Sequence, residues 1–224
     1  MKGCVMSESR AEISNRSKEA IFAGLKQGFK GENFIYKPST DPAVHIKSSA
    51  NAIEEMKQKM TDNKFIVEES DKANLEAKIN EIVAGYGYEK LIYPSNLGLD
   101  LSKINASEKI CFNEQIENLR QKVFHSEFSI INARCGVSSH GVVCVLSSKE
   151  QPRMLSLAPT LCIILLKKED VVKSMSQALN LVKKENPNLP NNILFIAGPS
   201  RTADIELITV FGVHGSQKVH LILY

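Results

Sequence analysis

From residue 64 onward, short apolar runs alternate with segments whose apolar residues recur at helical spacing. The apolar runs contain almost no polar residues, and "LCIILL" at 161–166 contains none. Runs of this kind indicate strands that are buried on both faces of a sheet. Strands that alternate with helices are typical of parallel sheets. We therefore predict an α/β fold, with a mainly parallel, Rossmann-like sheet covered by helices on both faces.

The helical spacing is clearest in residues 169–184, where one apolar stripe is followed by Pro187 and Pro190. A further helix is expected over residues 114–124. The first 60 residues read as two helical segments joined by a connector that contains two prolines. We predict a helical N-terminal extension, residues 1–60, packed on an α/β domain of residues 61–224. The expected strands are "KFIVEE", "KLIYP", "KICFN", "FSIINA", "GVVCVLS", "TLCIILL", "NILFIAG" and "KVHLILY".

Charge and hydropathy exclude several classes of function. The net charge is only +3, and no basic block stands out, so the sequence offers no electrostatic basis for binding nucleic acid. The N-terminus lacks the apolar core of a secretory signal, and the longest apolar run is too short to span a bilayer. We expect a cytoplasmic protein that does not insert into a membrane.

The five cysteines are scattered and form no C-x-x-C pair. This spacing fits neither a disulfide framework nor a zinc or iron–sulfur site. The five histidines show neither H-x-x-x-H nor H-E-x-x-H. We therefore expect no metal and no cofactor on this chain, so that any redox cluster it works with belongs to another protein.

The stretch "IAGPSRTADIE" at 196–206 is the first candidate site. Gly198 allows a tight turn, and Ser200 or Thr202 can cap a following helix, with Asp204 in its first turn. The free N–H groups of such a helix start, together with the Arg201 guanidinium, suit a phosphate or a carboxylate. Capping alone also explains the Ser, Thr and Asp, so a helix start without a ligand remains the alternative.

Other loops could contribute to the same site. In α/β sheets, ligands bind outside the carboxyl ends of the strands, where "NARCGVSSHG" and "SSKEQPR" are also expected. His214, between two glycines in "FGVHGSQKVH", could donate a proton or contact an anion, or be an ordinary turn residue. Arg153 could supply a second cation, or lie on the surface. Asp204 and His214 are the candidates for a catalytic base.

Taken together, the final third of the chain resembles a known family. The segments "PRMLSLAP", "TLCIILLKKEDVV", "GPSRTADIE" and "FGVHGSQKVHLILY" occur in an order that is similar to LUD-domain proteins of the lactate-utilisation protein C group. The resemblance is most specific over roughly residues 128–224. It implies a fold like that of the superfamily of sugar-phosphate isomerases, glucosamine-phosphate deaminases and coenzyme A transferases.

The resemblance also implies a part in the oxidation of L-lactate to pyruvate, beside iron–sulfur partner proteins. Family members commonly read Glu-Thr-Gly where this chain has Ser139-His140-Gly141. The chain thus lacks an acidic residue in the loop where a related coenzyme A transferase would place its carboxylate nucleophile. His140 becomes a possible replacement contact to a ligand.

Three hypotheses for function follow. The first is an accessory component of lactate utilisation that binds a small anionic ligand through Ser200, Arg201, Thr202 and His214, with Arg153 and His140 as contributors. The second is a stand-alone isomerase or transferase-like enzyme that acts on a phosphorylated or acyl metabolite. The third is a scaffold protein whose motif residues serve only folding.

Overall fold

The computed structural model describes residues 10–28, 51–203 and 209–224. The chain forms two units, Met1–Thr40 and Asp41–Tyr224. The first unit contains the helix α1 (Arg10–Gly28), and the second contains the other described elements. The packing of residues 1–60 on the main domain stays a prediction.

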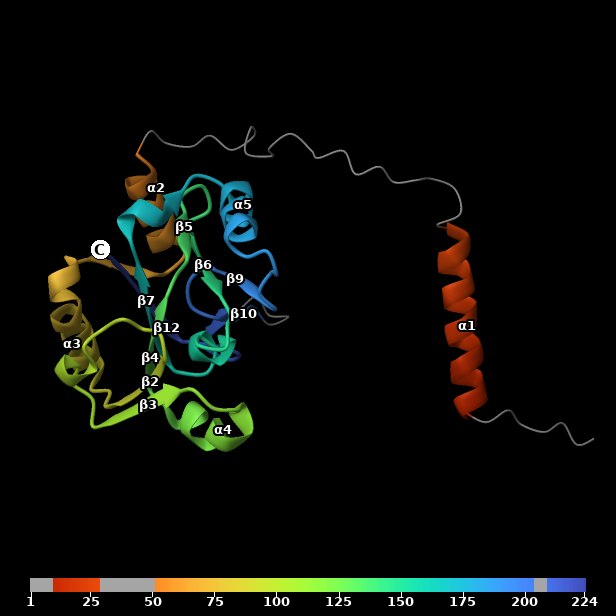
Figure 1. Ribbon diagram of the computed structural model, residues 1–224, viewed down its shortest axis with the longest axis horizontal. Coiled ribbons are helices and arrows are strands. Elements are labelled where there is room, and N and C mark those ends of the chain that lie inside the picture. The colour runs from red at the N-terminus through yellow and green to blue at the C-terminus, as the bar shows by residue number, and fades with distance from the viewer. Residues whose placement is uncertain (1–9, 29–50, 204–208) are drawn as a thin grey trace, which may run out of the picture. The chain divides into compact units, whose positions relative to one another are not determined.

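A six-stranded parallel sheet forms the centre of the second unit (Figure 1). Its strand order is β1-β12-β7-β4-β2-β3, and every neighbouring pair is parallel. The predicted mainly parallel sheet is therefore confirmed. The strands are β1 (Ile66–Glu69), β2 (Lys90–Pro94), β3 (Glu108–Phe112), β4 (Phe128–Asn132), β7 (Leu161–Leu166) and β12 (Lys218–Leu223).

Helices cover both faces of this sheet (Figure 1). On one face α3 (Leu75–Tyr86) buries Leu75, Ile79, Ile82 and Val83. On the other face α2 (Ala52–Asp62) inserts Met56 and Met60, which are fully buried, and α4 (Ile116–His125) adds Leu119 and Val123. The two apolar clusters on opposite faces are why the strands contain so few polar residues.

A second sheet packs on the face that α2 covers. It has the order β8-β5-β6-β9, and β6 runs antiparallel to both β5 and β9. The expected strands "GVVCVLS" and "NILFIAG" therefore exist, but they belong to this smaller sheet. Its strands are β5 (Cys135–Val137), β6 (Val142–Leu146), β8 (Val171–Val172) and β9 (Ile193–Ile196). The helix α5 (Met175–Glu185) packs against it through Ala178 and Val182.

The helix expected over residues 169–184 begins later than its spacing predicts. Val171 and Val172 form β8, which pairs with β5. Ser174 then caps α5, because its hydroxyl accepts a hydrogen bond from the Gln177 N–H at 3.2 Å. The apolar stripe extends across both elements, so helical spacing alone could not separate the strand from the helix.

The helix expected after "AGPS" does not form at the predicted position. Arg201–Ala203 is a strand, β10, which pairs antiparallel with β11 (Thr209–Phe211). Ser200 and Thr202 are therefore not helix caps, and Asp204 lies outside the described residues. The strand forms because residues 201–203 find pairing partners six to ten residues further along the chain, which a local capping pattern cannot reveal.

A buried polar cluster lies between α3 and the sheet edge at β1. His220 of β12 is 5% exposed, and its Nδ1 lies 2.9 Å from Glu68 Oε1. Its Nε2 lies 2.8 Å from the Tyr86 hydroxyl. An ionised carboxylate only accepts hydrogen bonds, so Nδ1 donates to Glu68, and Nε2 of the neutral ring accepts from Tyr86.

Candidate functional site

A cavity of about 210 Å³ lies beside the amino ends of β7 and β12, next to the last residue of β9. Cys162, Val219 and Ile196 give it an apolar floor, and Ser200 and His214 bring polar side chains to it. Sequence reasoning placed the site at the carboxyl ends of the strands. Ser200 does follow the carboxyl end of a strand, β9 of the small sheet, but the loop after β9 brings it to the amino edge of the large sheet.

Backbone hydrogen bonds fix the two loops that form the cavity. The Ser200 N–H donates to the Ser216 carbonyl at 3.0 Å, and the Gly212 N–H donates to the Ser200 carbonyl at 2.9 Å. The Ser216 hydroxyl donates to the Pro159 carbonyl at 2.8 Å. Gly215 allows the close approach, since a Cβ atom on it would lie 3.1 Å from Ser200 Cβ. Ser200 is therefore positioned by its backbone while its hydroxyl keeps its hydrogen-bonding capacity.

Several hydrogen-bond donors at this cavity have no acceptor within the described ranges. They are the backbone N–H groups of His214, Gly215 and Ser216 and the hydroxyl of Ser200. Of these residues only Ser216 is buried, at 4% exposed, whereas Gly215 is half-buried and His214 is exposed. Buried backbone N–H groups are nearly always paired, if not with protein then with water or a ligand. The arrangement thus suits an acceptor-rich ligand such as a carboxylate.

Arg201 and Thr202 belong to β10 and do not line the cavity. The Arg201 side chain is exposed, and its Nη2 donates to the Ala197 carbonyl at 2.9 Å. Arg201 therefore closes the loop 197–201, which contains the cavity-lining Gly198 and Ser200, and its guanidinium keeps donors for a ligand. Thr202 is half-buried and stands opposite Val210 in the hairpin.

Arg153 and His140 lie apart from Ser200 and His214. Arg153 lines a separate hollow of about 470 Å³, where its Nη1 donates to Asn192 Oδ1 at 3.4 Å. His140 is exposed in the turn between β5 and β6, with its Nδ1 2.7 Å from the Ser139 hydroxyl. The structure thus brings two of the six expected ligand-binding residues to one cavity.

The thiol at the floor of the cavity is not an activated nucleophile. Burial raises the pKa of Cys162 to about 12. Cys162 stands opposite Ser129 of β4 in the large sheet, and both residues are buried. A thiol with such a high pKa is neutral and unreactive near pH 7. Cys162 therefore contributes shape and apolar surface.

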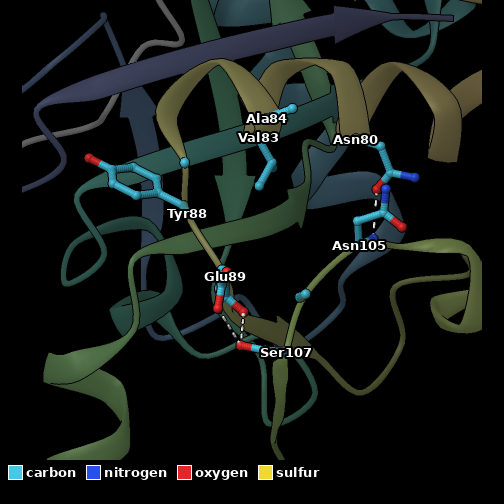
Figure 2. A pocket seen from close by; sticks show the side chains of 9 residues that line it. Asn80, Val83, Ala84, Tyr88, Glu89, Asn105 and Ser107 are labelled. Carbon is cyan, nitrogen blue, oxygen red and sulfur yellow. Dashed lines mark hydrogen bonds between the residues drawn. The ribbon is translucent and has the colours of Figure 1, made fainter.

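A larger hollow of about 390 Å³ lies where α3 ends (Figure 2). The side-chain amide of Asn80 already has partners within the protein. Its Oδ1 accepts a hydrogen bond from the Asn105 N–H at 2.7 Å, and its Nδ2 donates to the Lys103 carbonyl at 2.7 Å. Glu89 accepts a hydrogen bond from the Ser107 hydroxyl at 3.0 Å (Figure 2). These polar groups join α3 to the loops before β2 and β3, which is a structural role.

Sequence reasoning missed Ser216 and Ser156, which also line the cavity, and Asn63, which supports it. Asn63 follows α2, and its carbonyl packs on Gly198. The flanking glycines of His214 were the only local signal for this half of the site. Ser156 and Asn63 are distant in sequence and carry no motif, so only the tertiary structure could assign them.

Comparison with known proteins identifies the family. Residues 53–224 match the profile of the LUD domain, which is more than half of the chain. The chain belongs to the LUD domain family. The predicted resemblance is therefore confirmed, and the LUD domain includes α2 as well as the α/β elements.

Relatives of this LUD domain include proteins named for lactate utilisation. The chain is 27% identical over 219 residues to "Lactate utilization protein C" of Halalkalibacterium halodurans, which covers 94% of this chain and 95% of that protein. It is 36% identical over 110 residues to "Lactate utilization protein C" of Bacillus subtilis, which covers 48% of this chain and 45% of that protein. Several curated relatives are matched over less than half of their own length.

A solved structure supports the fold. The crystal structure of a DUF162 family protein from Deinococcus radiodurans superposes with a TM-score of 0.59 over 77% of this chain and 95% of that chain. The two sequences are 13% identical, so the likeness concerns the fold alone. Among the described residues of this LUD domain protein, no three His, Cys, Asp or Glu side chains gather as metal ligands would. In the same ranges, every helix is too short or too polar to cross a bilayer.

Proposed function

We propose that this LUD domain protein is an accessory, ligand-binding component of L-lactate utilisation, in which lactate is oxidised to pyruvate. Two relatives that carry the name lactate utilisation protein C support this assignment, one of them over 94% of this chain. In this proposal the iron–sulfur clusters belong to partner proteins, and the chain carries no cofactor of its own.

The ligand that we propose for the cavity is a small carboxylate, with a short-chain hydroxy or oxo acid as the first candidate. The observation that carries this proposal is that Ser200 and residues 214–216 line the cavity beside its apolar floor and have donors with no acceptor among the described residues. A carboxylate accepts several N–H and O–H hydrogen bonds at once. The apolar floor at Cys162 and Val219 suits the methyl end of such an acid.

His214 also supports the alternative of a stand-alone isomerase or transferase-like enzyme, because it is a titratable side chain at the cavity. That alternative needs a general base within reach of the substrate. The other candidate for this role, Asp204, lies outside the described residues. Conversion of a bound acid by the purified chain alone would favour the enzyme over the accessory component.

Isothermal titration calorimetry of the full chain with L-lactate, pyruvate and inorganic phosphate tests the binding site. We expect saturable binding of at least one of the two carboxylic acids. Ser200→Ala and His214→Ala should each weaken this binding about tenfold, since a lost hydrogen bond to a charged group is worth about 1.5 kcal/mol. Arg153→Ala is the matched control, because Arg153 lies in a different hollow.

Binding that is unchanged in both cavity variants, or that Arg153→Ala weakens equally, would contradict this site.

The pathway assignment is tested separately by deleting the gene in its own host and measuring growth on L-lactate. Loss of growth on lactate, with normal growth on pyruvate, is the expected result. Normal growth on both carbon sources would contradict the assignment.

A further inference from the structure

Two cysteines of the small sheet stand directly opposite each other. Cys135 of β5 is the register partner of Cys144 of β6, and these strands are antiparallel. Opposite residues of an antiparallel pair have Cα atoms about 4.5–5.5 Å apart and side chains on the same face. Disulfides span Cα separations of about 4.4–6.8 Å. A bond between these two sulfur atoms therefore requires no rearrangement of the strands.

The chemistry of the pair also favours bond formation. A hydrogen bond from the Cys144 thiol, and then the charge of Arg134, lower the pKa of Cys135 in spite of its burial. Arg134 is held beside the pair by two carboxylates: its Nε donates to Glu185 Oε2 at 2.6 Å and its Nη1 to Asp170 Oδ1 at 2.8 Å. These carboxylates oppose the effect of Arg134. A thiolate is the nucleophilic form of cysteine, so Cys135 is the sulfur that reacts first.

The pair is separated from the other described thiols and from bulk solvent. Both residues are 0% exposed and lie in the apolar cluster under α5. Cys162 and Cys111 belong to the large sheet. An oxidant that reaches the pair must be small and uncharged, and it enters during local opening of the small sheet. A hydroperoxide meets these requirements, whereas a bulky disulfide reagent does not.

We propose that Cys135 and Cys144 are a redox-active pair that a hydroperoxide converts to an intramolecular disulfide. The Cys135 thiolate attacks the O–O bond, which gives a sulfenic acid and hydroxide. The Cys144 sulfur then attacks the sulfenic sulfur; the S–S bond forms, the S–O bond breaks, and the thiol proton leaves with the oxygen as water. Overall, two thiols are oxidised and one hydrogen peroxide is reduced to two waters. A dithiol reductant returns the disulfide to two thiols and is itself oxidised to a disulfide.

The full reduced chain, treated with hydrogen peroxide and then alkylated with N-ethylmaleimide under denaturing conditions, tests the proposal. The reduced protein should take up five maleimides, one for each cysteine, and the oxidised protein three. Before alkylation, oxidation without adduct should lower the mass by about 2 Da. Trypsin leaves both residues in the single peptide 135–149, so without reductant this peptide should carry an internal disulfide and be about 2 Da lighter than after reduction. Dithiothreitol should restore all five labels.

Two matched variants sharpen the test. Cys111→Ser removes a half-buried, solitary thiol, so it should still lose two labels on oxidation. Cys144→Ser should lose the internal disulfide of peptide 135–149, while a dimedone adduct on Cys135 reports the trapped sulfenic acid. The proposal is overturned if wild-type protein keeps five labels, if the disulfide that forms contains another cysteine, or if Cys144→Ser still forms an intramolecular bridge.

Discussion

Gly198 packs against the backbone carbonyl of Asn63 so closely that no Cβ atom fits between them. Its φ angle is +98°, a conformation that residues other than glycine rarely adopt. The Asn63 side-chain amide donates to the carbonyl oxygens of His140 and Gly141 at 3.2 and 3.3 Å. Asn63 thus connects the loop at the candidate cavity to the turn between β5 and β6.

We expect Gly198→Ala to lower the free energy of unfolding by about 3 kcal/mol, because it adds backbone strain and a steric clash. Urea unfolding followed by circular dichroism measures this change. Gly85→Ala in α3 is the control, since Gly85 has open space around it and no positive φ. It should leave stability unchanged or raise it by up to about 1 kcal/mol. Equal stability of the two variants would contradict the role of Gly198.

Gly215→Ala should narrow the candidate cavity. The added methyl group would lie 3.1 Å from Ser200 Cβ, and the φ of Gly215 is not in the left-handed region. We therefore expect the affinity for the bound carboxylic acid to fall about tenfold, with a change in stability below about 1.5 kcal/mol. Calorimetric titration and urea unfolding of the same preparation separate these effects. An unchanged affinity would indicate that the acid binds elsewhere.

Removal of the α5 cap should weaken the small sheet. Ser174 is 4% exposed and accepts a hydrogen bond from the Gln177 N–H, so Ser174→Ala should reduce the free energy of unfolding by about 1 kcal/mol. Gln115 precedes α4 in the equivalent position, but its side chain forms no capping hydrogen bond. Gln115→Ala should therefore leave the urea midpoint almost unchanged. A similar loss in both variants would argue against the capping role.

The pH dependence of stability should report on His220. Burial lowers the pKa of His220 below its ordinary value, although the hydrogen bond and charge of Glu68 oppose this shift; Lys218 lowers it further. The remaining groups that face the cluster are Tyr86, which pairs with His220, and Lys78, which pairs with Glu68.

The unfolded chain takes up this proton at about pH 6.5, and the folded chain at lower pH. The contribution of neutral His220 is therefore fully present above about pH 6.5 and is lost as pH falls through the folded-state pKa. Urea unfolding between about pH 7 and about pH 5 should show a decline in the free energy of unfolding. The decline with falling pH should be less steep for His220→Gln than for the wild-type protein. Identical slopes for the two proteins would contradict the assignment to His220.

Much of the large sheet could be predicted from sequence, because its strands and helices carry local signals. The unbroken apolar run 161–166 indicated a strand buried on both faces, and β7 is such a strand. The helix expected over residues 114–124 forms as α4, Ile116–His125. In these cases the side chains alone determine which surface must be buried.

The candidate site was harder to predict, because its parts meet only through long-range pairing. Residues 201–203 carry capping signals, yet they form a strand with residues 209–211. The motifs of Ser200 and His214 were visible in the sequence, whereas their shared cavity with Ser156 was not. Arg153 and His140 had suitable chemistry, but their chain segments lead to other surfaces.

Local patterns were enough to predict a buried parallel sheet and a resemblance to the LUD domain family, since apolar periodicity and short motifs are properties of contiguous residues. The tertiary structure decided that β5, β6, β8 and β9 form a separate sheet, that Cys135 stands opposite Cys144, and that Ser200 meets His214 at the amino edge. These relationships depend on strand pairing and on the approach of distant loops, which no local pattern encodes.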